Sequence, residues 1–279
     1  MTVFKRKTRR VFKIAGPDAQ TLLHDVFTAK MPENETGANW WALLSPQGKV
    51  QAEGLIGLHQ GAFWLDVSHD IAPKFSRRMG MYKLRANATI EDMSETHQAG
   101  WSGADCDLKG AISHKDTRHP DMGFRIISTN ADTTGWSEQE QEAQTNRVKL
   151  GIPELGHDFQ SDAVFPHDIA MDLLEGIDFA KGCYVGQGVV SRMRHRANIR
   201  RRPVIIKLVR GNIGDEVMLG GKTVGTIGSV EDGHGVAIVR LDKISDPNQL
   251  EINGQNVVAQ IPPWADYDFA GAPNPDKQV

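Results

Sequence analysis

The chain has 279 residues, of which 39% are hydrophobic and 24% are charged, and its formal net charge is −3. This composition is that of an ordinary globular protein. The slight acidity excludes a protein that binds nucleic acid or membrane surfaces over its whole surface, so any electrostatic function has to come from local clusters. The length exceeds that of one usual hydrophobic core and predicts two or three domains.

The chain has two cysteines, Cys106 and Cys183, far apart in the sequence. Such a pair is not a disulfide framework, and it predicts a reducing compartment. The basic run at residues 5–10 is followed by too few apolar residues for a signal peptide, and no apolar run approaches the length of a membrane span. We therefore expect a cytoplasmic protein that does not bind a membrane.

Residues 10–90 predict an antiparallel α+β unit, because strand-like runs alternate with two segments in which apolar residues recur at helical spacing. We expect strands at 10–14, 40–44, 49–56, 62–67 and 88–90, and helices at 17–27 and 71–84. The connections are short, and the turn at Ser45–Gly48 is typical of a hairpin. Both features favour antiparallel pairing over crossovers.

The pattern weakens between residues 94 and 121. Beyond it we expect a strand at 122–128, a helix at 137–150 and a short apolar helix at 169–174. Three side chains in the weak region, Cys106, His114 and His119, match no standard ligand spacing, and we expect no metal there.

Short strands separated by glycine turns follow Pro203. They are expected at 204–209, 216–219, 223–230, 234–241 and 257–261. Strands of this length and spacing predict a small antiparallel β-barrel over residues 203–265. Residues 266–279 are polar and rich in proline and glycine, and we expect them to form a polar tail on the surface.

The stretch around Cys183 has the composition of a reactive-thiol site. Positive charge near a thiol favours the reactive thiolate, and Lys181, Arg192 and Arg194 are close enough in sequence to supply it. Gly182 and Gly186 permit sharp turns or the close approach of a ligand. The alternative interpretation is a buried structural cysteine, since free cysteines are among the most buried residues.

An arginine run follows the cysteine stretch and comprises Arg192, Arg194, Arg196, Arg200, Arg201 and Arg202. One interpretation is a solvated helix face or linker. The other is a site for a polyanion, such as RNA phosphates or a carboxylate-rich partner, because arginine binds such groups bidentately.

The segment Lys181–Gln187, which reads KGCYVGQ, resembles the signature of the YgfZ-type folate-binding proteins. These are relatives of the glycine cleavage T-protein (aminomethyltransferase) and are implicated in iron–sulfur cluster assembly and repair and, in some bacteria, in tRNA modification. Further positions match in family order, at residues 16–19 and 44–50, at Arg147 with 151–154, and at 165–167. The resemblance is greatest to the branch shared by alphaproteobacteria and mitochondria.

The resemblance implies an α+β, T-protein-like ring of two interleaved α+β modules (residues 1–202) and the C-terminal barrel, with tetrahydrofolate held in a central channel. It implies a folate-binding accessory factor for iron–sulfur cluster assembly or repair. By residue, Cys183 is the functional thiol and makes transient contact with a cluster, with Lys181 beside it. The residues expected to bind the cofactor are Tyr184, Gly186, Gln187, Arg192, Arg147 and Asp66.

Two positions depart from the family pattern. Gly188 and Lys149 stand where relatives often have glutamate, and a lysine cannot accept the hydrogen bonds that a pterin ring offers. Either another carboxylate (Asp66, Glu154 or Asp178) takes this task, or folate binds weakly, or the ligand differs.

Two other functions stay open: a tetrahydrofolate-dependent aminomethyl or one-carbon transferase, and an RNA-binding module. Iron–sulfur clusters normally take four thiolate ligands, so one cysteine requires a partner or a dimer. We expect assembly proteins, client enzymes or tRNA as partners of a monomer or weak dimer, and no independent enzymatic turnover.

Overall fold

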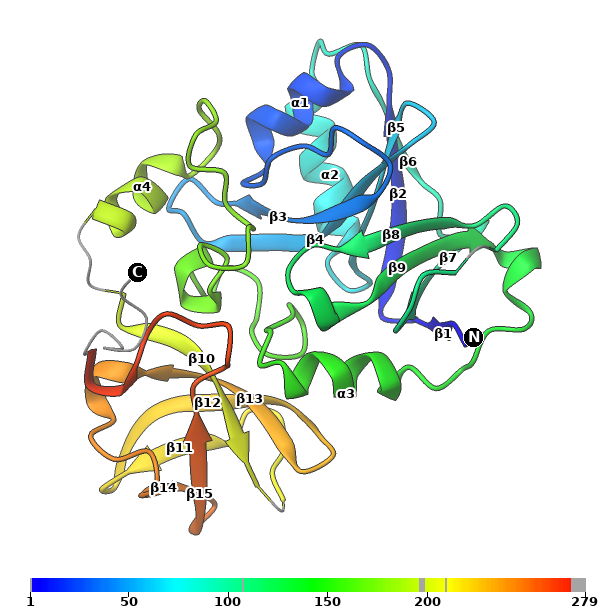
Figure 1. Ribbon diagram of the computed structural model, residues 1–279. Helices are drawn as coiled ribbons and strands as arrows, with labels where there is room; N and C mark the ends of the chain where they lie inside the picture. The colour runs from blue at the N-terminus through cyan, green and yellow to red at the C-terminus, as the bar shows by residue number, and fades with distance from the viewer. Residues whose placement is uncertain (1, 107, 196–198, 209, 272–279) are drawn as a thin grey trace. The chain divides into compact units, whose positions relative to one another are not determined.

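The computed structural model describes residues 2–106, 108–195, 199–208 and 210–271 (Figure 1). The chain divides into two compact units, each made of two separate segments. The first consists of Met1–Ala143 and Leu174–Val189, and the second of Gln144–Leu173 and Val190–Val279. The cysteine stretch therefore belongs to the first unit. Arg196 and Val209, each part of an expectation above, lie outside the described residues.

The first unit is built on a nine-stranded sheet with the order β1-β7-β9-β8-β3-β4-β5-β2-β6. Its strands are β1 Phe4–Lys5, β2 Arg9–Ala15, β3 Gly37–Leu44, β4 Val50–His59, β5 Ala62–Ser68, β6 Thr89–Asp92, β7 His97–Ser102, β8 Ile112–Asp116 and β9 Phe124–Thr129. The predicted hairpin is confirmed, since β3 pairs with β4. Strand β8, which lies in the region where the sequence predicted no strand, runs parallel to β3, with Gly37 opposite Lys115.

Strand β2 contributes to two apolar layers on opposite faces of the sheet. Phe12 and Ile14 pack with apolar residues of the two predicted helices, α1 (Ala19–Val26) and α2 (Ala72–Lys83). Val11 packs with residues of β7, β8 and β9, namely Ala99, Ile112 and Ile127. Successive side chains of a strand point to opposite faces, which is why Val11 and its neighbour Phe12 contribute to different layers.

The second unit contains a closed barrel with the order β10-β13-β12-β11-β14-β15, and Figure 1 shows its strands curving around a common core. The strands are β10 Arg201–Lys207, β11 Glu216–Leu219, β12 Lys222–Glu231, β13 His234–Arg240, β14 Leu250–Ile252 and β15 Gln255–Gln260. The predicted barrel is confirmed, with β14 as an additional strand. Tyr267 and Phe269, in the expected tail, pack against the barrel core.

Two more helices are α3 (Gln141–Lys149) and α4 (Gln187–His195). Short 3₁₀ helices are η1 Pro120–Met122, η2 Asn130–Thr133, η3 Pro166–Ile169, η4 Leu241–Lys243 and η5 Phe269–Gly271. The predicted apolar helix at 169–174 is wrong, because η3 ends where Ala170 adopts a left-handed conformation with φ of 60°. Among the described residues, no helix has the length and apolar character needed to cross a bilayer.

Candidate functional site

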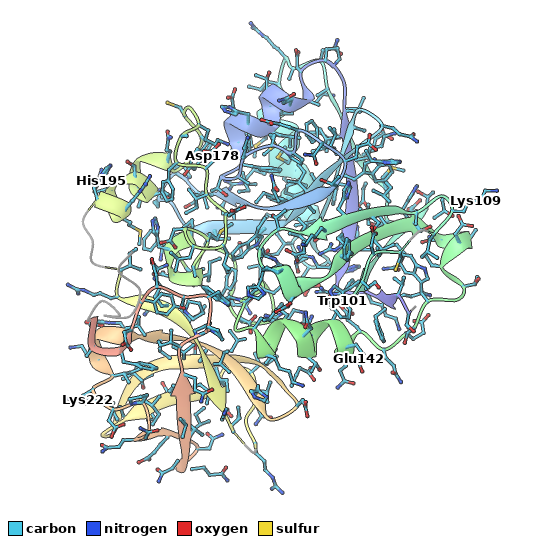
Figure 2. All side chains as sticks on the ribbon, viewed as in Figure 1. Trp101, Lys109, Glu142, Asp178, His195 and Lys222 are labelled. Carbon is cyan, nitrogen blue, oxygen red and sulfur yellow. The ribbon has the colours of Figure 1, made fainter. Side chains whose placement is uncertain are left out.

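Cys183 lies on a loop that leads into α4. Its side chain is exposed, whereas Cys106 is buried, and both are free thiols. Figure 2 labels Asp178 at the start of this stretch and His195 at the end of the helix that follows it. The interpretation of Cys183 as a buried structural cysteine is wrong, and it applies to Cys106 instead.

Lys181 fixes the loop to the segment that follows α1. Its Nζ donates hydrogen bonds to the carbonyl oxygens of Phe27 and Ala29, the second at 3.3 Å, and lies 5.0 Å from the centroid of the Tyr184 ring. Burial lowers the pKa of Lys181 from its usual 10.5 to about 8, although the charges of Asp178 and Asp25 partly offset this effect. Lys181 thus acts as an internal anchor for the loop that carries the thiol.

Gly186 and Gln187 also hold the loop in place. Gly186 has a φ of 82°, and a Cβ atom there would lie 2.8 Å from the carbonyl oxygen of Ser45, so a side chain would clash with the β3–β4 turn. The Nε2 of Gln187 donates to the carbonyl oxygens of Gly182 at 3.2 Å and Lys181 at 3.4 Å. These contacts give both residues of the motif a positioning role.

His24 is a neighbour of the loop that the sequence did not reveal. A side chain at Gly182 would lie 3.7 Å from Cε1 of His24. Nδ1 of His24 is 3.2 Å from Oδ1 of Asp25, and the His24 side chain is 40% exposed. Its proximity depends on the packing of the loop against α1, for which the local sequence carries no signal.

The arginine run does not form a uniform cluster. Arg192 and Arg194 are exposed on α4. Arg202 is buried and makes a bidentate ion pair with Asp172, with N–O distances of 2.6 and 2.8 Å. Arg201 points to the opposite face of β10, because side chains alternate along a strand. Arg202 is therefore unavailable to a polyanion.

Asp66, a predicted cofactor ligand, is fully buried in the first unit. One carboxylate oxygen lies 2.6 Å from Nη2 of Arg9, and the other pairs with Arg125. Arg9 also pairs with Glu53 at 3.0 Å. The carboxylate of Asp66 is thus neutralised by two guanidinium groups.

Arg147, the second predicted ligand, is buried in the second unit and has every donor engaged. Its Nε and Nη2 donate to Gln144 at 3.0 and 2.8 Å, and Nη2 also donates to Ser229 at 2.6 Å. Nη1 donates to the carbonyl oxygen of Ile152 at 2.6 Å and to Asp158 at 2.5 Å. A guanidinium has five N–H donors, so none is left for a ligand.

The carboxylates named as alternatives for folate, and the two positions that depart from the family pattern, have the following surroundings. Lys149 pairs with Asp232 at 2.6 Å on the surface, and Glu154 is buried beside Arg147. Oδ1 of Asp178 accepts the backbone N–H groups of Ala180 and Lys181. Gly188 has no atom within 4 Å of the place where its Cβ would lie. The charged side chains of Asp66, Arg147 and Lys149 could therefore bind a pterin only by breaking contacts that they already make, whereas Arg192 is exposed.

The described residues contain no group of three or more His, Cys, Asp or Glu side chains arranged to hold a metal ion. Two of the side chains between residues 94 and 121 that were considered as metal ligands contact backbone carbonyl groups. Nε2 of His114 is 2.8 Å from the carbonyl oxygen of Leu58. The thiol of Cys106 donates to the carbonyl oxygen of Ala104 at 3.4 Å.

The fold is that of the aminomethyltransferase T-proteins. Glycine cleavage system aminomethyltransferase T from Bartonella henselae superposes with a TM-score of 0.70 over 96% of this chain and 87% of that one, at 12% identity. Residues 200–267 match the family described as CAF17, C-terminal beta-barrel domain. The predicted α+β, T-protein-like fold with a C-terminal barrel is confirmed.

The chain is similar to proteins named iron–sulfur cluster assembly factor IBA57. The Pyricularia oryzae homolog is 29% identical over 70% of this chain, and the Neurospora crassa homolog is 30% identical over 71%. The matches span about half the length of these fungal relatives, 54% and 52%. The mouse protein is 24% identical over 94% of this chain and 85% of its own length.

These relatives correct one expectation. All three are named as mitochondrial proteins, which contradicts the cytoplasmic location predicted from the two cysteines and the short basic N-terminal run. Cysteine usage indicates a reducing environment, but it does not distinguish one reducing compartment from another.

Proposed function

We propose that this protein is an accessory factor in iron–sulfur cluster assembly or repair, and that Cys183 is the thiol that contacts the cluster or its carrier. The observation that carries the proposal is an exposed thiol on a loop anchored from within by Lys181 and Gln187. The similarity to proteins named iron–sulfur cluster assembly factors supports it. Placement among the YgfZ-type proteins, in the branch shared by alphaproteobacteria and mitochondria, is part of the proposal.

The chain supplies one ligand at most from this site. Clusters are normally held by four thiolates, and the other cysteine, Cys106, is buried. The remaining ligands have to come from an assembly protein, a client enzyme or a second copy of the chain. An exposed thiol on a rigid loop suits such a shared ligand, because the loop does not have to be ordered again when the partner binds.

Complementation tests this function. Cells whose own copy of the gene is deleted would express the wild type, Cys183→Ser or Cys106→Ser, and the activity of an iron–sulfur enzyme would be compared with that of a cluster-free enzyme. We expect Cys183→Ser to fail and Cys106→Ser to succeed at equal protein levels. Full complementation by Cys183→Ser would contradict the role of the thiol.

Tetrahydrofolate is the ligand that the family resemblance implies, and we derive no step through it because Asp66 and Arg147 are engaged in buried ion pairs. Calorimetric titration of the wild type, Lys149→Glu and Gly188→Glu with tetrahydrofolate tests binding directly. The alternative function, an aminomethyl transferase, requires turnover of an aminomethyl donor by the purified protein. Folate binding without turnover would exclude that alternative.

A further inference from the structure

A cleft of about 460 Å³ lies on the outer wall of the barrel, within the second unit. Its floor is formed by β10, β12 and β13, and its wall by the segment from His157 to Val164. The apolar lining includes Phe159, Val164, Ile213 and Ile238. Ile213 is 61% exposed, so part of this apolar surface is open to solvent. The volume is typical of sites that bind small molecules.

The wall is fixed to the barrel by buried hydrogen bonds. Oδ1 of Asp158 accepts the backbone N–H of Ser229 at 2.7 Å, and Arg147 joins Asp158 to the side chain of Ser229. A Cβ atom on Gly228 would lie within 2.3 Å of Asp158, so the glycine permits the close approach of the wall. The cleft is therefore already formed without a ligand, and binding would not require the segment from His157 to Val164 to become ordered.

Arg201 introduces one uncompensated positive charge at this cleft. It is exposed and lies directly opposite Arg240 in the β10–β13 pairing. Arg240 is neutralised by a bidentate pair with Asp242, at 2.7 and 2.9 Å. Within the described part of the chain, no hydrogen bond or ion pair engages the side chain of Arg201. Because Asp242 compensates the charge of Arg240, the guanidinium of Arg201 is the one of this opposed pair that is available to an anion.

We propose that this cleft binds a small amphipathic monocarboxylate, with its carboxylate on Arg201 and its aliphatic body against Phe159, Val164 and Ile238. A guanidinium pairs bidentately with a carboxylate. A single available cation matches a single negative charge, whereas a polyanion would need several. This site is independent of Cys183 and of the proposed function, because its residues all belong to the second unit.

The test uses octanoate as the probe and the full-length protein with isotopically labelled isoleucine methyl groups. Octanoate should shift the methyl resonances of Ile213 and Ile238 saturably, and should leave that of Ile56, in the core of the first unit, unchanged. Arg201→Gln should weaken binding about tenfold, which is the loss expected for one charge-assisted hydrogen-bonded pair. Arg200→Gln, which changes an exposed arginine outside the cleft lining, is the matched control and should bind as the wild type does.

Acetate lacks the apolar body and octanol lacks the charge, so both should bind more weakly than octanoate. The proposal is overturned if octanoate causes no saturable shift up to its solubility limit, if Arg201→Gln binds as tightly as Arg200→Gln, or if octanol matches octanoate. Tighter binding of an acidic peptide than of octanoate would also overturn the assignment to a small ligand. Arg201 is exposed, so its substitution should leave the fold intact, and an unchanged melting temperature would verify this.

Discussion

Nη1 of Arg147 lies 2.5 Å from Oδ2 of Asp158, and both side chains are buried in the second unit. Asp158 also accepts the backbone N–H groups of Glu154 and Ser229, each at 2.7 Å. We expect Asp158→Ala to lower the free energy of unfolding of this unit by about 3–5 kcal/mol, because the charge of Arg147 would remain buried without this partner. Urea denaturation followed by circular dichroism measures the loss.

The control for this prediction is Asp242→Ala. Asp242 pairs with Arg240 at 2.7 Å on the surface of the same unit, where both side chains are about one-third exposed, at 32% and 33%. Removing an exposed pair should cost less than about 1 kcal/mol. Equal losses for the two variants would show that the Arg147–Asp158 pair does not hold the unit together.

The two thiols should differ sharply in accessibility. Cys183 is exposed and Cys106 is buried. Iodoacetamide should therefore modify Cys183 in the folded protein and reach Cys106 at least about a hundredfold more slowly, since modification of a buried group requires local opening. Mass spectrometry of digested protein at successive times gives both rates. Similar rates in native buffer would contradict the exposure of the loop, whereas in denaturant the rates should converge.

The elements that could be predicted from the sequence are those with a strong local signal. The barrel, α1, α2 and the β3–β4 hairpin show regular periodicity or turn residues. Strands β7 and β8 were missed because they carry polar residues such as His97 and His114 and gain their stability from pairing with β9. The parallel contact of β8 with β3 joins segments far apart in sequence, and no local pattern encodes it.

For the loop that carries Cys183, the motif residues could be predicted from the sequence, but the atoms that they contact could not. The motif identified Cys183, Lys181 and Gln187, but the atoms that anchor Lys181 are the backbone carbonyls of Phe27 and Ala29, which have no side-chain signature. The roles of Asp66 and Arg147 depend on partners such as Arg125 and Ser229, which lie distant in the chain. A residue type shows what chemistry is available, whereas its partners decide whether that chemistry is free for a ligand.

Gly186 should be irreplaceable for conformational reasons. Its φ of 82° disfavours other residues, and an added Cβ would lie 2.8 Å from the Ser45 carbonyl oxygen and 3.0 Å from Cβ of Leu44. We expect Gly186→Ala to destabilise the first unit by about 2–4 kcal/mol, from the left-handed backbone and the overpacking together. Thermal and urea unfolding provide the measurement.

Gly188→Ala is the matched substitution two residues further on. Gly188 lies in α4, and a Cβ there meets no atom within 4 Å. Alanine has a higher helix propensity than glycine, so this variant should be as stable as the wild type or more stable by up to about 1 kcal/mol. If both variants lose stability equally, the close packing of Gly186 against the β3–β4 turn is not what restricts the loop.

The buried amine of Lys181 should make stability depend on pH. Its pKa in the folded protein is about 8, below the usual 10.5 that applies to the unfolded chain. Between these two values the unfolded chain binds a proton that the folded protein does not, so the free energy of unfolding rises with pH across this window. Relative to Lys181→Met, whose side chain does not titrate, the wild type should gain at most about 3 kcal/mol between the two values. Chemical denaturation at a series of alkaline pH values gives the free energy of unfolding of both proteins. In the difference between the two, the contributions of titrating groups that both proteins share cancel. Parallel curves for the two proteins would mean that the ammonium group of Lys181 is not desolvated by the loop.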